Sequence, residues 1–596
     1  MPKSFILRVL VLLASISGAL GAQPAAAQPT AGPAPGAPAS LERIYEEYFE
    51  EYLEINPIFA SLIGDERYTN RLTMDIDPNV LARYREMVDR YLERTSGIDP
   101  EKLDEHERVH FEAFRYLLAT TRDGFEFPDH LMPIAPGTGI PSQLIQMASG
   151  DGVHPFRTVK DYEDFIARLW QFPAWVGLAI ANMNEGMERG IVEPGILIHL
   201  ALQEIGPYTQ DRKKSWEVFY RPIKQAPRTI SAEDRRRLEA EFRSAIEQQV
   251  KPAFRRLFAY LRDRYRPRST ISLSQLPDGE RWYRHRVRFF TTTDLEPDEI
   301  YALGLREVER VEGELEQLRR RLEFRGNASS FRDIMARDRK NYIHGDRAVV
   351  NLYDRIRKDV TAALPKLFNR VPATPFEIRR VDPSRESSSP GAFYQPGSAD
   401  GSRPGIFFFR LWDGYHPTYS METLFLHEGL PGHHFQTAMA QELDVPRFLR
   451  FGYFGAYVEG WGLYAETLGH DLGLYTEPRQ LFGHLDFDLG RASRLVGDVG
   501  IHHKKWSHAE ALRELQARHL DWAANEMDRR YVAIPAQALS YKIGELEILR
   551  LRQAAEAKLG DRFDIRRFHE VLLEDGPLPL TVLAGKVERW LARGGR

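Results

Sequence analysis

Apolar side chains recur at three- and four-residue intervals along most of the chain, with charged side chains between them. That spacing follows the 3.6-residue turn of an α-helix and predicts amphipathic helices. The clearest predicted helices are residues 41–53, 80–95, 161–189, 232–264, 297–324 and 346–367, and later 509–522, 546–559 and 582–591. The chain is therefore expected to be mainly α.

One region, residues 376–410, has a different pattern. It contains Ile378, Val381, "GAFYQPG" and "GIFFFRL", separated by "SRESSSPG" and "SADGSRPG". Aromatic and β-branched runs bounded by turn residues predict short strands. We therefore expect a small β-sheet directly before a His-Glu segment, with a plain surface loop as the alternative.

The first 40 residues differ in composition from the rest. A basic start at residues 1–8 is followed by an apolar run to about residue 20 and then by Ala25-Ala26-Ala27. This order predicts a secretory signal peptide over residues 1–27, and the Pro/Ala/Gly-rich residues 28–40 predict a disordered leader. The apolar run is shorter than the ~20 residues of a membrane span, and a retained anchor helix is the alternative.

The composition limits which classes of protein and which binding partners are expected. The chain has no cysteine, which excludes disulfides, thiolate zinc sites, cysteine nucleophiles and a lipid-carrying cysteine. Without Lys3 and Arg8, 79 of the 81 basic residues remain against 85 acidic ones, and no long basic stripe is present. We therefore expect a periplasmic or secreted protein without a nucleic-acid partner or stable membrane insertion. The oligomeric state stays open.

The length of the chain predicts its domain organisation. About 570 residues remain after the signal peptide, more than the roughly 250–300 that one hydrophobic core usually supports. We expect a single catalytic domain of two lobes over residues 41–596, with the active-site half at about residues 376–560.

The segment "LHEGLPGHHFQ", residues 426–436, begins like the zinc-protease motif H-E-x-x-H. In that motif the two histidines lie one helical turn apart and reach the same ion. Here His433 and His434 follow His427 by six and seven residues, which is ~9 and ~10.5 Å along an unbroken helix. An intact helix therefore cannot bring either of them to the metal, since zinc binds nitrogen at ~2.0–2.1 Å.

Pro431-Gly432 offers a way around this distance. Proline removes a helical hydrogen bond and clashes with the carbonyl four residues back, and glycine permits unusual backbone angles. An interruption here would return a late histidine to the metal. The direct succession of Gly432 and His433 favours His433, and His434 remains the alternative ligand.

A third ligand is predicted in "GAYVEGWGLYAETLGHDLGLY", residues 455–475. Glu459 and Glu466 lie on one helical face with Gly455 and Gly462. Glycine costs ~1 kcal/mol in a helix, which close approach to another helix or an ion would explain. Glu459 is the expected ligand, and Glu466 lies ~10.5 Å further along the axis. Nitrogen and oxygen ligands without thiolate favour one Zn²⁺ ion, with manganese or cobalt as alternatives.

Four segments together carry a family resemblance: "HEGLPGHHFQ", "YVEGWGLYAE", "VGDVGIHHKKW" and "ALSYKIGELEI". They resemble the bacterial domain-of-unknown-function family 885, and the similarity covers about residues 41–591. The resemblance implies a zinc-dependent peptidase of the H-E-x-x-H superfamily with a glutamate as third ligand. A more distant likeness to helical carboxypeptidases and oligopeptidases implies a deep channel between the two lobes.

Roles in hydrolysis follow from this reading. Glu428 is the expected general base for a zinc-activated water. His502, oriented by Asp498, and Tyr541 are candidate donors to the oxyanion, an assignment that depends on the resemblance. The strand "GIFFFRL" is expected to pair with an extended substrate. Cations that could hold a substrate carboxylate are Arg403, Arg494 and Lys542.

The sequence thus predicts an exported zinc peptidase acting on short peptides, of carboxypeptidase, dipeptidase or oligopeptidase type. Two alternatives remain: a zinc hydrolase of another amide, and a catalytically inactive peptide-binding protein. Glu428 argues against the last alternative, because ligation alone does not need that residue.

Overall fold

The computed structural model describes residues 40–149, 152–210, 213–383, 391–398, 403–517, 524 and 526–595. The predicted signal peptide and almost all of the predicted leader therefore lie outside the described residues. Ser40 is the first described residue, and its side chain caps the first helix by accepting a hydrogen bond from the Arg43 amide. None of the helices in these ranges combines the length and the apolar character that crossing a bilayer requires.

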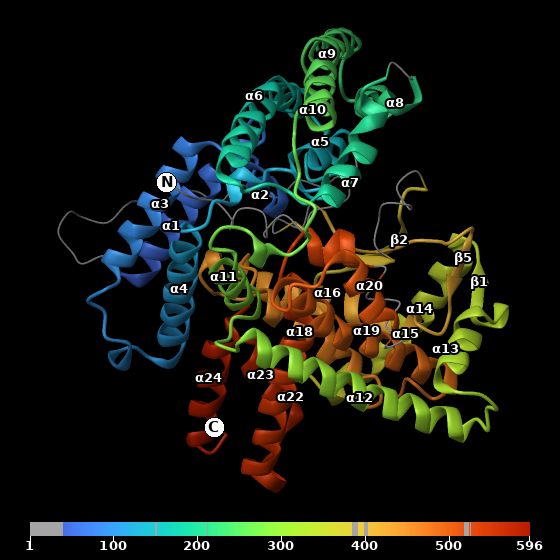
Figure 1. Cartoon of the computed structure of the whole chain (residues 1–596). Coiled ribbons are helices and arrows are strands. Elements are labelled where there is room, and N and C mark those ends of the chain that lie inside the picture. Colours follow the sequence, from blue (N-terminus) through green and yellow to red (C-terminus); the bar gives the residue numbers. More distant parts are fainter. Residues whose placement is uncertain are drawn as a thin grey trace.

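The chain is mainly helical, as predicted (Figure 1). The N-terminal helices are α1 (Leu41–Ile55), α2 (Pro57–Ile63), α3 (Pro78–Arg94), α4 (Glu105–Gly124), α5 (Ile140–Ala148), α6 (Val159–Arg189), α7 (Gly195–Ile205), α8 (Lys213–Lys224), α9 (Ala232–Ala245) and α10 (Lys251–Asp263). The central helices are α11 (Gly279–Thr291), α12 (Pro297–Arg321), α13 (Ala328–Arg337) and α14 (Asp346–Ala363). A π-helical turn, Ile246–Val250, joins α9 to α10.

The C-terminal helices follow the strands. They are α15 (Met421–Glu428), α16 (His433–Gln441), α17 (Arg447–Arg450), α18 (Gly455–Thr467), α19 (Pro478–His502), α20 (His508–Ala517), α22 (Ser540–Leu559), α23 (Ile565–Leu573) and α24 (Leu580–Ala592). Helix α18 packs lengthwise on α22, and α12 on α19. This packing buries almost every residue of α18, including its two glutamates.

The strands form two small sheets. A two-stranded sheet pairs β1 (Tyr342–His344) with β5 (Tyr415–Pro417) in antiparallel orientation. A three-stranded sheet has the order β2 (Phe376–Arg380), β4 (Gly405–Phe409), β3 (Ala392–Gln395). Strand β4 runs parallel to β2 and antiparallel to β3. The predicted small sheet before the His-Glu segment is confirmed.

The expectation that "GIFFFRL" pairs with a substrate is wrong. Its strand, β4, has β2 on one side and β3 on the other, so both of its backbone edges are occupied. All five residues of β4 are buried, because both faces of the central strand are covered. Within the described residues, the strand next to α15 is β3, which carries an unpaired outer edge.

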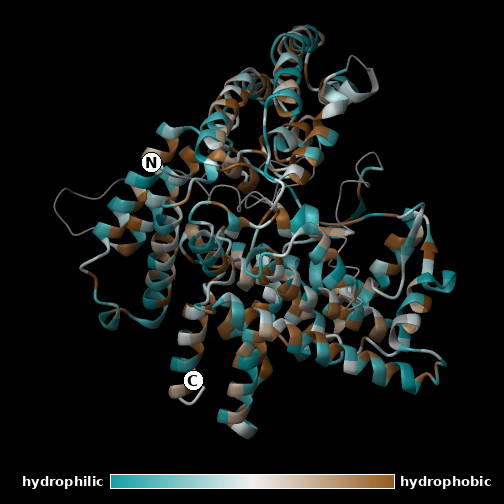
Figure 2. Ribbon diagram, viewed as in Figure 1, coloured by the Kyte–Doolittle hydropathy of each residue, from teal (hydrophilic) through white to brown (hydrophobic). Residues whose placement is uncertain are grey.

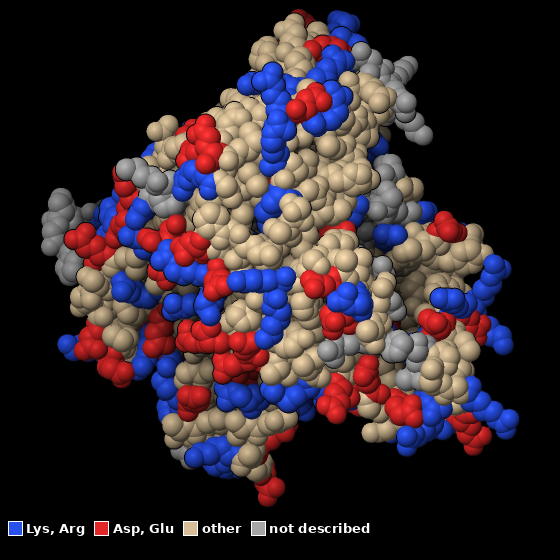
Figure 3. All heavy atoms as spheres, in the orientation of Figure 1, with Lys and Arg blue, Asp and Glu red and all other residues tan. Residues whose placement is uncertain are grey.

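The main hydrophobic core extends from Ile44 of α1 to Leu591 of α24. Figure 2 shows hydrophobic positions concentrated on the packed sides of the helices and hydrophilic positions on their outer sides. On the face drawn in Figure 3, basic and acidic side chains are interspersed. The amphipathic spacing in the sequence thus corresponds to the inward and outward faces of the helices.

Candidate metal centre

The His-Glu segment is interrupted at the point where the sequence places Pro431-Gly432. Helix α15 ends at Glu428 and α16 begins at His433. The backbone of Gly432 packs so closely on the end of α15 that a Cβ there would lie 2.0 Å from the carbonyl oxygen of His427. Only glycine fits this approach. The turn therefore brings His433 closer to His427 than an unbroken helix would.

Three side chains meet beside this turn: His427, His433 and Glu459. Nε2 of His433 lies 3.4 Å from Oε2 of Glu459, and Nε2 of His427 lies 3.9 Å from the same oxygen. The two imidazole rings are 4.6 Å apart between centroids. Tetrahedral ligands at ~2.0–2.2 Å from zinc would be roughly 3.4 Å from one another. The cluster therefore has the dimensions of a metal site.

The polar atoms of the cluster are buried and incompletely paired. The exposed fractions of His427, His433 and Glu459 are 3%, 7% and 7%. Among the described residues, Oε2 of Glu459 and Nδ1 of His433 have no hydrogen-bond partner. Buried polar atoms are almost always bonded to something. A metal ion that accepts lone pairs from the cluster would satisfy Glu459 Oε2, so these residues fit a zinc ion.

Electrostatics within the cluster favour ligation. Burial lowers the pKa of His427 well below its ordinary value. Burial would raise the pKa of Glu459, but the hydrogen-bonding contact with His433 and the charge of His433 hold that pKa at about 2. Glu459 is thus ionised and His427 neutral, which are the protonation states that metal ligands need. The third residue differs: burial would lower the pKa of His433, but contact with Glu459 raises it, so a metal ion would compete with a proton at that ring.

A second layer of contacts supports the three side chains. Oε1 of Glu466 lies 2.8 Å from Nδ1 of His427, on the side of the ring away from Nε2. The Tyr453 hydroxyl donates a hydrogen bond of 3.2 Å to Oε1 of Glu459. The Tyr453 hydrogen bond is of the kind that fixes the orientation of a metal ligand. Glu466 Oε1 and His427 Nδ1 are close, but neither atom has a hydrogen-bond partner among the described residues. Glu466 therefore lies outside the three-residue cluster and beside His427, as its seven-residue distance from Glu459 predicts.

Glycines allow α18 to approach its neighbours. A Cβ on Gly462 would lie 2.8 Å from Cε1 of His427 and 3.1 Å from Cε1 of His433. A Cβ on Gly460 would collide with the backbone of Gly544 in α22. The predicted close approach of this helix to another helix is confirmed, and Gly462 lies against the imidazoles of the cluster.

Replacing Gly462 by alanine is expected to push both imidazoles out of position. We expect metal affinity to fall by about 10–100-fold, the range seen when contacts around metal ligands are lost. Titration with a competing zinc chelator measures the change. The matched control is Gly313→Ala at an exposed position of α12, where a Cβ meets nothing within 4 Å. That control should keep full affinity and gain up to about 1 kcal/mol of stability. Equal affinity in both variants would contradict the packing argument.

Glu428 lies at the end of α15, directly after His427, and is buried. Burial raises the pKa of its carboxyl to about 7, against the opposing charge of His433 and a backbone contact from Tyr394. A carboxyl that titrates near neutral pH is suited both to accept and to donate a proton. Tyr394 belongs to β3, so the sheet edge and Glu428 are neighbours.

His434, the alternative ligand, is not brought into the cluster. Its Nδ1 is 3.0 Å from the hydroxyl of Tyr394, and its Nε2 is 3.1 Å from the carbonyl oxygen of Thr374. Both ring nitrogens are therefore engaged, and the ring packs against Phe376. The structure thus places His433, and not His434, in the cluster.

The proposed role of His502 is corrected by its contacts. The amide of Leu273 donates to Nδ1 of His502, and Nε2 donates to the carbonyl oxygen of Tyr531. Both nitrogens are used by buried backbone, so none is left for an oxyanion. Asp498 does not orient this ring; it accepts hydrogen bonds from the Tyr283 hydroxyl and the Ala536 amide. His502 is therefore a buried histidine whose two ring nitrogens are bonded to the backbone, and not the predicted oxyanion donor.

Tyr541 does lie beside the cluster. Its ring is nearly parallel to that of His427, at 9° and 6.4 Å between centroids. Its hydroxyl oxygen accepts a hydrogen bond of 3.1 Å from Nη1 of Arg530. The hydroxyl hydrogen has no acceptor among the described residues, so it can donate to a ligand.

The three cations considered for a substrate carboxylate have other contacts. Arg403 donates to the carbonyl oxygen of Leu62. Lys542 is fully buried and pairs with Asp488 and Glu545. Arg494 makes a bidentate pair with Glu526 while its guanidinium lies 4.1 Å above the Tyr541 ring. Of the three, only Arg494 belongs to the surroundings of the cluster.

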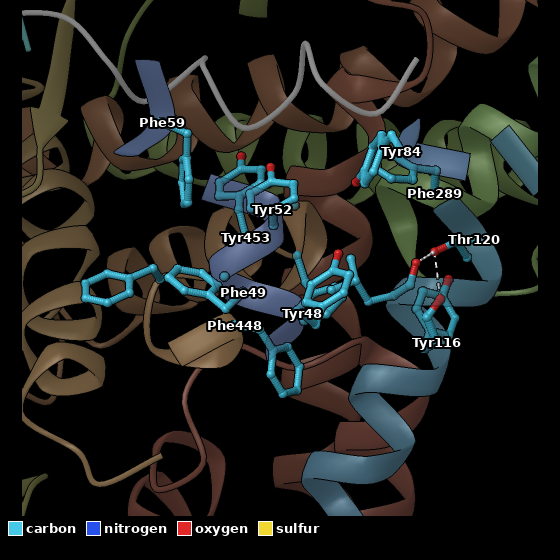
Figure 4. A pocket seen from close by; sticks show the side chains of 15 residues that line it. Tyr48, Phe49, Tyr52, Phe59, Tyr84, Tyr116, Thr120, Phe289, Phe448 and Tyr453 are labelled. Carbon is cyan, nitrogen blue, oxygen red and sulfur yellow. Dashed lines mark hydrogen bonds between the residues drawn. The ribbon is translucent and has the colours of Figure 1, made fainter. Parts of the chain in front are cut away.

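Sequence reasoning missed two residues at this site, Tyr453 and Arg530. Tyr453 precedes Glu459 by six residues and lies just before the segment from residue 455 that the sequence analysis considered. Its ring also lines a cavity of about 50 Å³ with Tyr48, Tyr52, Phe289 and Phe448, as Figure 4 shows. Arg530 had no signal, because a basic pair in a polar segment is typical of solvated surface.

Fold and site together define a mainly helical protein with a buried His-His-Glu cluster of metal-site dimensions. The chain belongs to the family described as "Bacterial protein of unknown function (DUF885)", whose model matches residues 57–587. No curated protein matches it.

Two solved structures share the fold. One is described as a "putative lipoprotein from Colwellia psychrerythraea"; it has a TM-score of 0.83 and 24% identity, covering 93% of this chain and 99% of that chain. The other, a "putative lipoprotein of unknown function from Shewanella oneidensis", has a TM-score of 0.64 and 16% identity, covering 92% and 99%. At these identities the likeness shows the fold alone.

Proposed function

We propose that this protein is an exported zinc-dependent peptidase that hydrolyses short peptides. The observation that carries the proposal is the buried cluster of His427, His433 and Glu459, with Glu428 directly after the first ligand. Three protein ligands with room for a further one are typical of catalytic rather than structural zinc. The proposed location is the periplasm or the exterior, and the chain has no cysteine to carry a lipid.

A zinc ion held by these three residues would lower the pKa of a bound water toward ~7 and polarise a peptide carbonyl. Glu428 accepts the proton of the attacking water and passes it to the leaving amine. Tyr541 donates its hydroxyl hydrogen to the carbonyl oxygen as negative charge develops there. Glu466 and Tyr453 hold His427 and Glu459 in place.

The sheet supplies the proposed substrate contact. An extended peptide can add to an unpaired strand edge through its backbone. We assign that role to the outer edge of β3, in place of β4, because Tyr394 of β3 contacts Glu428. The proposal includes two lobes with a channel between them. Such a channel would restrict access to the metal centre to short, unfolded peptides.

Metal removal is expected to abolish activity reversibly. Purified protein should contain one zinc per chain and cleave a mixture of short peptides, with products identified by mass. Dialysis against a chelator should remove both metal and cleavage, and added zinc should restore both. A chain without metal, or cleavage that survives complete removal of metal, would contradict the proposal. Bound zinc without peptide cleavage would redirect the search to another amide or to a binding role.

A further inference from the structure

A cluster of arginines lies on the Tyr541 side of the candidate metal centre. Arg530 belongs to a π-helical turn, Met527–Val532, which follows α20 in the chain. Such turns are rare and often occur at functional sites. Arg494 projects from α19 and meets Arg530 around the ring of Tyr541, at 4.1 and 5.4 Å from its centroid.

Arg494 and Arg530 share one carboxylate in direct contact. Glu526 accepts two hydrogen bonds from Arg494, and its Oε1 lies 3.4 Å from Nε of Arg530. One carboxylate thus serves two guanidiniums. Buried and half-buried charges are normally paired one to one, since an unmatched charge loses hydration without compensation. Glu459 also acts electrostatically on Arg530, but among the described residues no ion pair joins the two, so the carboxylate of a ligand would be a second direct partner for Arg530.

Arg530 is the member that a ligand can reach. Its side chain is 25% exposed, whereas that of Arg494 is 3% exposed. Nη1 of Arg530 donates to Gln537 Oε1 at 2.9 Å and to the Tyr541 hydroxyl at 3.1 Å. Nη2 makes no hydrogen bond to any described residue, so part of the guanidinium fork is available. A guanidinium fork matches the two oxygens of a carboxylate.

The cluster is one side chain away from the candidate metal. The Tyr541 hydroxyl accepts a hydrogen bond from Arg530, and the Tyr541 ring is nearly parallel to the ring of His427. Arg530 and Glu459 are also close enough to influence one another electrostatically. One peptide residue spans at most ~3.3–3.6 Å. A group held by Arg530 is therefore within a residue or two of a peptide bond placed at the metal.

We propose that Arg530 binds the C-terminal carboxylate of the peptide substrate, which makes the enzyme a C-terminal exopeptidase. This inference rests on the proposed peptidase function. Water adds across the scissile amide, so that the N-terminal product gains a carboxylate and the released C-terminal product gains an amine. The released product keeps the carboxylate that Arg530 holds. Tyr541 links this recognition to the carbonyl that reacts.

Binding to an inactive protein tests the carboxylate site without requiring cleavage. The protein is Glu428→Gln loaded with zinc, and the probes are acetyl-Ala-Ala-Phe, its C-terminal amide, and acetyl-Ala-Ala-Glu amide. Calorimetry should show the acid binding about 10–100-fold more tightly than its amide, the range for a hydrogen-bonded charge. Adding Arg530→Gln should remove that preference, and Arg530→Lys should restore part of it. Arg529→Gln, an exposed neighbour, should change nothing.

Each result decides the assignment. Equal binding of the acid and its amide would overturn it, and so would a preference that survives Arg530→Gln while zinc is retained. Tighter binding of the glutamate amide than of the phenylalanine acid would overturn the assignment to the C-terminus. Cleavage by the parent chain is measured separately on the same probes. If the parent cleaves acid and amide equally, the peptidase proposal stands and this one fails. If it cleaves neither these probes nor the peptide mixture, the peptidase proposal fails and the exopeptidase assignment fails with it, while a preference for the acid would still assign a carboxylate-binding site to Arg530.

Discussion

Glu428→Gln is expected to reduce peptide hydrolysis by at least about 10³-fold while the protein keeps its zinc. General acid–base catalysis contributes roughly 10²–10⁴-fold, and Glu428 is assigned both proton transfers of the reaction. Glutamine has the same shape but cannot accept the proton of the attacking water. Glu428 is not among the three cluster residues, so metal content should not change.

The control for this substitution is Glu422→Gln on the same helix. Glu422 is also buried, and it accepts a hydrogen bond of 2.7 Å from Gln480, away from the cluster. The Glu422→Gln variant should therefore keep its zinc and most of the kcat of the parent. Kinetics on a cleaved peptide and metal analysis of both variants give the comparison. Activity retained by Glu428→Gln, or lost equally in both variants, would remove Glu428 from the role of base.

Local patterns in the sequence predicted the helices well, because one buried face suffices to define an amphipathic helix. The predicted helix at 232–264 is one continuous element except for the π-helical turn at Ile246–Val250, which three- and four-residue spacing cannot reveal. The order of strands in the sheet was not predictable from alternation alone. The uninterrupted apolar run "GIFFF" was a sign of a central strand buried on both faces, and it was misread as an edge.

The candidate site was predictable where it depends on helical geometry. Glu459 and Glu466 share a face of α18, and their seven-residue spacing places one at the cluster and the other behind His427. The choice between His433 and His434 depends on backbone angles in the turn at residues 429–432, which composition does not determine. His502 was misassigned because a histidine in a motif carries no sign of whether buried backbone already uses its nitrogens.

The contrast between His433 and His434 yields the second large effect. His433→Gln should lose metal, and with it all activity, because one of three ligands is gone. The loss of affinity should exceed the roughly 10–100-fold caused by losing a contact that only supports a ligand. His434→Gln should keep one zinc per chain. The His434→Gln substitution should instead lower the free energy of unfolding by about 1–3 kcal/mol, because Tyr394 and Thr374 lose a buried hydrogen-bond partner.

Zinc content and thermal unfolding of the two variants, with and without chelator, separate these outcomes. The parent and His434→Gln should both be stabilised by added zinc, because a ligand that binds only the folded state raises its stability by mass action. His433→Gln should unfold at the same temperature with or without zinc. Loss of metal in His434→Gln but not in His433→Gln would contradict the assignment of His433 and make His434 the ligand. The turn at Gly432 would then have to adopt a different backbone when metal binds, since in this structure His433 faces Glu459 and His434 contacts Tyr394 and Thr374.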